Sequence, residues 1–213
     1  MKRNKNLFIT IEGGEGSGKT TQSLLLKEYL EKKGYKVLLT REPGGTVLAE
    51  AIRSILLNPN LNLVPISELF LYEAARAQHI KEFIFPALKS GKVVICDRFT
   101  DATIAYQGYG RKLNLQLINR LNSVASFGLT PGLTIYLDIQ PFKGLNKAKK
   151  LNKEAYGENG DRIERESIKF HNMVRKGYLN QAKKYNKRIK VVKTQKTSEK
   201  TQMLIKKIID MVL

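Results

Sequence analysis

Short apolar runs alternate along this chain with longer stretches of helical periodicity, a pattern typical of a parallel sheet flanked by helices. Each run is rich in β-branched residues or leucine, as strands buried on both faces are. We expect five strands, over residues 7–12, 37–41, 93–97, 133–138 and 189–194. Helices are expected over residues 18–33, 65–89, 114–127, 161–184 and 198–213. The predicted fold is therefore α/β, with a five-stranded parallel sheet between two layers of helices.

Composition narrows the class of protein. The 213 residues are 42% hydrophobic, enough for a sizeable core, so we expect residues 1–213 to form a single domain. The chain contains no 18-residue apolar run, and its basic start (residues 1–6) is followed only by a short strand pattern, so we expect neither a membrane span nor a signal peptide. The single cysteine, Cys96, rules out an internal disulfide. A reducing cytoplasm fits these features.

The formal charge of +19 predicts an affinity for polyanions, such as nucleic acid, acidic membranes or small phosphate compounds. Charge alone does not choose among them. The alternative is that the charge reflects no binding site but a drift of the composition toward lysine and asparagine on solvated faces. Most of the positive charge is lysine, spread along the chain together with many asparagines. No compact arginine-rich block is present, and we expect neither nucleic acid nor a membrane as a partner.

Residues 13–20, Gly-Gly-Glu-Gly-Ser-Gly-Lys-Thr, match the phosphate-loop pattern G-x-x-x-x-G-K-[ST], between a predicted strand and a predicted helix. Glycines let backbone N–H groups turn inward around phosphate oxygens, and the helix that follows directs its positive end there. Lys19 is expected to bridge the β- and γ-phosphates of ATP, and Thr20 to offer its hydroxyl to Mg²⁺. The expected ATP-binding residues are Gly13, Gly14, Glu15, Gly16, Ser17, Gly18, Lys19, Thr20 and Thr21.

Further segments bear on the phosphate acceptor. They are Thr-Arg-Glu-Pro-Gly-Gly-Thr (40–46), Tyr-Glu-Ala-Ala-Arg (72–76), Asp-Arg-Phe (97–99) with Ala-Tyr-Gln-Gly (105–108), and Asp-Arg-Ile-Glu (161–164). In a parallel sheet, ligands collect at the carboxyl ends of the strands, and Glu15, Arg41, Asp97 and Arg98 fall at or just beyond such ends. Arginine binds phosphate bidentately, so this crevice suits an acceptor that is itself a phosphate monoester.

Taken together and in this order, these motifs resemble those of the bacterial thymidylate kinase family, over about residues 7–178. The resemblance implies a P-loop NTPase fold and transfer of the ATP γ-phosphoryl group to dTMP, with Mg²⁺ as cofactor. The implied partners are thus two small-molecule nucleotides, ATP and dTMP. A homodimer is also implied by the resemblance alone.

The resemblance implies a role for each matching residue. Tyr72 would stack on thymine, Arg76 and Gln107 would contact the base, and Arg53 and Arg98 would hold the acceptor phosphate. The full sets are: substrate-binding residues Glu15 (also near the sugar 3′-hydroxyl or the Mg²⁺ shell), Arg41, Arg53, Tyr72, Arg76, Arg98, Thr103, Tyr106 (under the deoxyribose) and Gln107; catalytic residues Lys19, Arg98, Arg162 and Glu15; metal-binding residues Thr20 and Asp97.

A lid is expected over about residues 142–160, a segment rich in Lys and Asn that we interpret as a helix tail leading into a mobile loop. Kinases need such a cover to keep water from the γ-phosphate. In this family the arginine that stabilises the transferred group comes from the P-loop or from the lid. Gly16 occupies the P-loop position here, so we expect Arg162 to be the main cation, with Lys149 as a helper.

Several residues have structural alternatives. Tyr72 could be a core aromatic residue, Arg41 and Glu42 an ion pair in a turn, Asp97 a helix cap, and Arg53 a solvated helix residue. Three other functions remain open at this point: a kinase for another acceptor, a nucleic-acid-dependent ATPase, and a nucleotide sensor without turnover. Outside the motifs, we interpret Cys96 as a buried, inert thiol and both histidines, at positions 79 and 171, as structural.

Overall fold

The computed structural model describes residues 8–157 and 160–212. All five predicted strands are present: β1 (Phe8–Gly13), β2 (Val37–Arg41), β3 (Val93–Asp97), β4 (Leu133–Asp138) and β5 (Ile189–Lys193). They form one sheet in the order β2-β3-β1-β4-β5, and every neighbouring pair is parallel. The predicted starts and ends at Leu7 and Leu213 lie outside the described residues. Among those described, no helix has both the length and the apolar character needed to cross a membrane.

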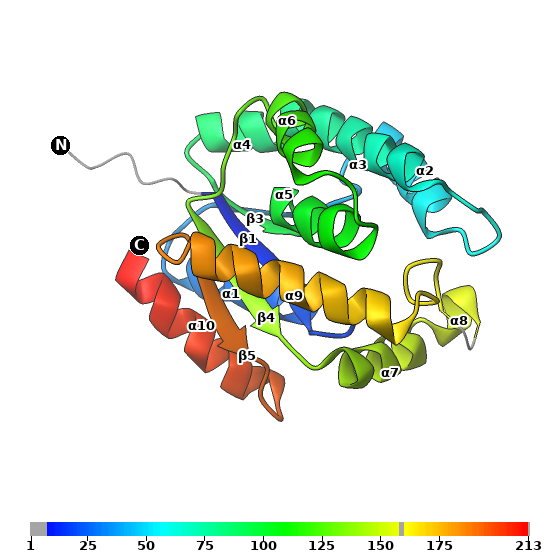
Figure 1. Ribbon diagram of the computed structural model, residues 1–213. Coiled ribbons are helices and arrows are strands. Elements are labelled where there is room, and N and C mark those ends of the chain that lie inside the picture. The colour runs from blue at the N-terminus through cyan, green and yellow to red at the C-terminus, as the bar shows by residue number, and fades with distance from the viewer. Residues whose placement is uncertain (1–7, 158–159, 213) are drawn as a thin grey trace.

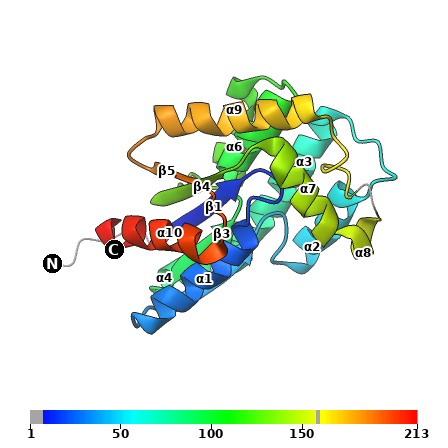
Figure 2. The ribbon, with the colours of Figure 1, turned by 90° about the horizontal axis from the view of Figure 1, so that it is seen from below.

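The helices are α1 (Lys19–Lys32), α2 (Val47–Leu57), α3 (Pro65–His79), α4 (Phe85–Lys89), α5 (Thr100–Thr103), α6 (Leu115–Ala125), α7 (Pro141–Leu151), α8 (Lys153–Tyr156), α9 (Ile168–Lys184) and α10 (Ser198–Val212). Two π-helical turns, η1 (Ile80–Ile84) and η2 (Ile104–Gly110), join α3 to α4 and extend α5. Figure 2 shows α1 and α10 below the sheet and α9 and α6 above it. The three-layer α/β prediction is confirmed.

Apolar packing explains the layers. On one face, α1 and α10 cover the sheet with Leu26, Leu30, Ile205 and Ile209, all at most 1% exposed. On the other face, η2 and α9 pack together around buried aromatic residues, and the Tyr136 and Tyr178 rings stack with their centroids 4.8 Å apart. These two cores leave the carboxyl ends of the strands as the edge where loops and polar groups can gather.

Three local predictions differ from the structure. Residues 47–57 and 100–110 are helical, although neither range is among the five helices predicted from periodicity. The predicted helix 65–89 is interrupted by η1, next to Pro86, whose ring nitrogen cannot donate to a regular α-helical ladder. The predicted helix 161–184 begins only at Ile168, because Ser167 accepts a hydrogen bond from the Phe170 amide and caps it there.

The segment predicted as a lid, residues 142–160, is helical over most of its length rather than a helix tail and a loop. It contains most of α7 and all of α8. Residues 158 and 159 of this segment lie outside the described residues. After it, residues 161–164 form a turn in which Asp161 Oδ1 accepts hydrogen bonds from the amides of Ile163 and Glu164, each at 2.9 Å.

Candidate active site

The phosphate loop connects β1 to α1 with a backbone that requires glycine. Gly16 and Gly18 have φ values of 62° and 89°, in the left-handed region, and Gly18 directly precedes α1. The Lys19 ammonium donates to the Gly14 carbonyl at 3.0 Å, which folds the side chain back over the loop. Burial and the neighbouring Arg98 charge lower the pKa of Lys19. The loop thus presents a partly desolvated cation where phosphate oxygens would lie.

Thr20 and Asp97, the two predicted metal-binding residues, lie together at the mouth of this loop. The Thr20 hydroxyl donates to Asp97 Oδ2 at 2.9 Å, although the residues are 77 positions apart in sequence. A hydroxyl beside a carboxylate is the oxygen donor set that Mg²⁺ prefers in phosphoryl-transfer sites, so the residues fit this cofactor. The alternative of Asp97 as a helix cap is not what the structure contains, because α5 begins without a side-chain cap.

The phosphate loop is in close contact with α7. A Cβ atom built on Gly16 would overlap the carbonyl oxygen of Gly144, and one on Gly144 would overlap the carbonyl oxygen of Glu15. The two glycines therefore allow two backbones to meet without side chains between them. A cavity lies at the phosphate loop, lined by Lys19 and Thr20, and is called the phosphate cavity. Ala148 and Leu151 of α7, and Asn152 after it, also line this cavity.

A second cavity adjoins the phosphate loop, and the two cavities have Glu15, Arg53 and Arg98 among their shared lining residues. Of the nine predicted substrate-binding residues, the structure brings eight to the wall of the second cavity: Glu15, Arg53, Tyr72, Arg76, Arg98, Thr103, Tyr106 and Gln107. Arg41 lies instead at the wall of the phosphate cavity, which also includes Glu15, Arg53 and Arg98.

Glu15 and Arg98 line both cavities, and Tyr106 lines the second cavity beside them. Arg98 donates to Glu15 Oε1 at 2.6 Å, the Tyr106 hydroxyl donates to the same oxygen at 2.7 Å, and the guanidinium lies 4.8 Å from the centre of the Tyr106 ring. Burial alone would raise the pKa of Glu15, but the charges of Arg98 and Lys19 and the Tyr106 hydrogen bond lower it to about 2. Glu15 therefore stays ionised and holds Arg98 in place.

The backbone at Arg98 is held by a residue that the sequence analysis did not single out. Arg98 has a φ of 72°, which is unusual for a residue with a side chain. The next amide, of Phe99, donates to Glu12 Oε1 at 2.7 Å, and the Tyr178 hydroxyl donates to Glu12 Oε2 at 2.8 Å. Burial, together with the nearby Asp101 carboxylate, raises the pKa of Glu12 to about 8. Glu12 thus ties the turn after β3 to α9.

Arg76 is fixed by four hydrogen bonds. Its Nε donates to Glu42 at 2.8 Å, its Nη1 to Glu73 and to Asn122 at 2.8 Å each, and its Nη2 to Thr103 at 2.9 Å. A guanidinium has five N–H groups, so these bonds leave one N–H, on Nη2, for the cavity.

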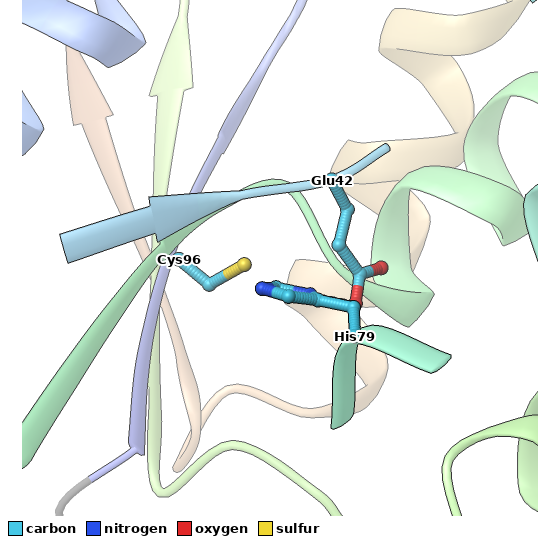
Figure 3. Close-up of side chains that lie close together, drawn as sticks. All are labelled: Glu42, His79 and Cys96. Carbon is cyan, nitrogen blue, oxygen red and sulfur yellow. Dashed lines mark hydrogen bonds and ion pairs between the residues drawn. The ribbon is translucent and has the colours of Figure 1, made fainter. Parts of the chain in front are cut away.

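Glu42 is itself supported by His79, which lies near Cys96 (Figure 3). The ligating atoms of Glu42, His79 and Cys96 lie within 4.8 Å of one another, close enough to suggest a metal centre. Their hydrogen bonds indicate otherwise: His79 contacts Glu42 through Nδ1 and Thr40 through Nε2, and the Cys96 thiol donates to the Arg98 carbonyl at 3.0 Å. Burial also raises the pKa of Cys96 well above its usual value, which disfavours the ligating thiolate. We interpret the cluster as support for Arg76.

Two alternatives from the sequence are settled by contacts. Arg41 does pair with a carboxylate, but with Glu50, at 2.9 Å to each oxygen, rather than with Glu42. Arg53 is half-buried and donates to the Pro43 carbonyl at 3.1 Å while it lines both cavities, so it is not a solvated helix residue. Tyr72 is also half-buried. Its side chain both packs against α2 and lines the second cavity.

The structure places Arg162 differently from the sequence prediction. Its Nη1 lies 2.6 Å from Glu68 Oε2, and its Nε donates to the Leu56 carbonyl at 2.7 Å. In the described part of the chain, neither Arg162 nor Lys149 is among the residues that line the phosphate cavity. Arg162 is committed to a buried carboxylate because an arginine at this depth needs a counter-charge. Glu68 was missed because a single acidic residue inside an amphipathic helix carries no motif.

Comparisons with known proteins agree with this geometry. A family model described as "Thymidylate kinase" matches residues 11–205. A thymidylate kinase from Syntrophotalea carbinolica is 52% identical over 188 residues, which cover 88% of this chain and 87% of the relative. One from Gloeobacter violaceus is 46% identical over 97% of this chain and 96% of its own. A crystal structure of thymidylate kinase from Ehrlichia chaffeensis superposes with a TM-score of 0.78 at 36% identity, covering 97% of this chain and 99% of that one.

The contact between α7 and the phosphate loop can be tested with Gly144→Ala. Alanine normally stabilises a helix interior by about 0.5–1 kcal/mol relative to glycine. Here the added Cβ would overlap the Glu15 carbonyl, so we expect the melting temperature to fall and the affinity for ATP to drop. Asn146→Ala, at an exposed position of the same helix, is the matched control and should lower neither. A raised melting temperature for Gly144→Ala would contradict the contact.

The ion pair of Glu15 predicts a pH dependence. Its folded-state pKa of about 2 lies below the ordinary value of 4.5, so its contribution to stability is complete above about pH 4.5 and is lost as the pH falls toward 2. Thermal unfolding of wild type and Glu15→Gln should therefore differ by a constant amount from pH 8 to pH 5. The difference should then shrink between pH 4.5 and pH 3. A difference that does not change over that lower range would show that the carboxylate is not stabilised as described.

Proposed function

The chain therefore belongs to the thymidylate kinase family, and from this membership we propose that it transfers the γ-phosphoryl group of ATP to dTMP, giving dTDP and ADP. One observation carries the proposal: the phosphate cavity and the second cavity share a wall in which Arg53 and Arg98 lie beside Glu15, Glu42 and Asp161. Two bound nucleotides would meet across this wall, with cations between their phosphates. That is the arrangement required for phosphoryl transfer between two anions.

The chemistry needs position and charge rather than a strong base. The dTMP phosphate oxygen is already anionic and attacks the γ-phosphorus in line. Lys19 and the loop amides hold the ATP phosphates, while Arg98 and Arg53 hold the acceptor phosphate. Thr20 and Asp97 would hold Mg²⁺, which supplies charge neutralisation for the transferred group.

The second cavity carries groups complementary to thymine. Tyr72 offers a ring face for stacking, worth about 1–3 kcal/mol per base in nucleic-acid sites. The spare N–H of Arg76 can donate to the O4 carbonyl of thymine, and the side-chain oxygen of Gln107 can accept from its N3–H. Thr103 supports Arg76, and Tyr106 lies where the deoxyribose would pass between base and phosphate.

The segment over residues 142–160 is proposed to act as the lid of this single-domain enzyme. It contacts the phosphate loop at Gly144, so its movement would open or close the phosphate cavity. Because Arg162 is bound to Glu68, we assign it to anchoring the segment after the lid, and we assign the charge stabilisation to Lys19, Arg53 and Arg98. We propose that the reaction takes place in the cytoplasm, where the lone thiol of Cys96 would stay reduced.

An acceptor panel tests the function and the substrate together. ADP release should be fast with dTMP and slower with dUMP, and it should be far slower with dCMP, dGMP, AMP and thymidine. Lys19→Ala should reduce turnover by about 100-fold or more while leaving the fold intact. Lys27→Ala, a partly exposed residue on the same helix, is the matched control and should keep full activity. Preference for another acceptor, or ATP hydrolysis that requires DNA or RNA, would reject the proposal.

A second copy of the chain is the proposed protein partner. Three neighbouring helices, α2, α3 and α6, carry exposed apolar side chains at Val47, Leu48, Ile55, Phe70 and Val124, between 41% and 92% exposed. Figure 1 shows these helices together along one side of the molecule, away from α1 and α10. Apolar residues concentrated on one side are typical of an interface between subunits.

Sedimentation velocity tests the dimer. The wild type should sediment at twice the 24.2 kDa mass of one chain. Phe70→Glu, which places a charge on the exposed side of α3, should shift the population toward monomer. Lys200→Glu, on the distant helix α10, is the control and should leave the dimer unchanged. A wild type that remains monomeric at micromolar concentration would exclude this partner.

A further inference from the structure

Glu68 is a carboxylate at the centre of a buried polar cluster behind the second cavity. It lies on α3, one turn before Tyr72, and is 0% exposed. Its Oε1 accepts from Gln107 Nε2 at 2.7 Å and from Arg111 Nε at 3.1 Å. Its Oε2 accepts from Arg111 Nη2 at 3.0 Å and lies 2.6 Å from Arg162 Nη1. A carboxylate has about four lone-pair sites, and these contacts fill them.

The cluster keeps Glu68 ionised. Burial would raise the pKa of this carboxyl, but the hydrogen bonds and charge of Arg111, with contributions from Gln107 and Arg162, lower it below its usual value. An ionised carboxylate only accepts hydrogen bonds. The group of Gln107 that faces Glu68 must therefore be the NH₂ group, because a carbonyl oxygen there would lie against the carboxylate oxygen Oε1.

The orientation of Gln107 follows from this contact. With Nε2 committed to Glu68, Oε1 is the side-chain atom left for the cavity, whose wall includes Gln107. We propose that Glu68 is a positioning residue that determines base selectivity, because it fixes the Gln107 amide with its oxygen toward the base. This inference rests on the proposed function, and it adds a reason why the acceptor is a thymine-type rather than a cytosine-type nucleotide.

The chemistry of the two pyrimidines gives the consequence. Thymine and uracil present an N3–H donor, which pairs with the Gln107 oxygen, beside an O4 acceptor, which pairs with the free N–H of Arg76. Cytosine presents an N3 acceptor and an N4 amine, so both contacts would place like groups together. A Gln107 amide free to rotate would present NH₂ to cytosine N3 and would remove one of the two mismatches. Selectivity then depends on a residue that does not touch the substrate.

Glu68→Gln tests the proposal, because its new NH₂ group can donate to Gln107 Oε1 and allow the amide to turn. We expect the ratio of kcat/KM for dTMP over dCMP to fall about tenfold or more, the effect of one buried unpaired polar group. Glu166→Gln is the matched control: it removes the other carboxylate partner of Arg111 but leaves every contact of Glu68, and the ratio should stay within about twofold. In a Gln107→Leu background, Glu68→Gln should change the ratio no further.

A measurement on the wild type covers the case in which Glu68→Gln does not fold, since two arginines would lose their counter-charge. The side-chain NH₂ signals of Gln107, assigned by their loss in Gln107→Leu, should be protected from solvent exchange in the free protein. They should remain protected when dTMP binds. Rapid exchange of these protons, or an unchanged selectivity ratio in folded Glu68→Gln, would overturn the inference.

The two proposals fail in different ways. A wild type that does not phosphorylate dTMP would reject the proposed function, while the exchange of the Gln107 amide would still report on its bond to Glu68. A wild type that phosphorylates dTMP, with a selectivity ratio that Glu68→Gln leaves unchanged, would reject the role of Glu68 alone.

Discussion

A guanidinium can stay buried beside a nucleotide only if the protein neutralises its charge and accepts its N–H groups. The site is built on this constraint. Arg98 is held by Glu15, Arg76 by Glu42 and Glu73, and Arg111 with Arg162 by Glu68. In Arg76, the carboxylates together with Asn122 and Thr103 accept four of the five N–H groups, and one is left for the cavity. Recognition is thus set by what the ion pairs leave unused.

These pairs come from separate parts of the chain, which the sheet brings together. Glu15 follows β1, Glu42 follows β2 and Arg98 follows β3, and the three strands are adjacent in the order β2-β3-β1. Parallel pairing therefore places their carboxyl ends side by side. The helices α2 and α3 and the π-helical turn η2 complete the wall of the second cavity. The fold contributes position, and the buried charges contribute orientation.

The fold and most of the site could be predicted from the sequence, because both rest on local patterns. Five strands follow from apolar runs, and eight of the nine residues predicted to bind the substrate line one cavity. What was missed depends on tertiary contacts. The partner of Arg41, the commitment of Arg162 and the role of Glu68 are each decided by a residue at least nine positions away. The helical turns at residues 100–110 are likewise held by packing against α9 rather than by a strong local pattern.

The shared wall has a consequence for how the two nucleotides bind. Arg98 lines both cavities, so a phosphate arriving on either side changes the field that the other phosphate meets. By thermodynamic linkage, the factor by which bound ATP alters the affinity for the monophosphate must equal the factor in the opposite direction. Glu15 is a negative charge at the same wall, so it contributes to the field that each phosphate meets before the other one binds. Any coupling between the two substrates of this enzyme is therefore reciprocal, and the shared wall, with the ion pair of Glu15 and Arg98, is where it would arise.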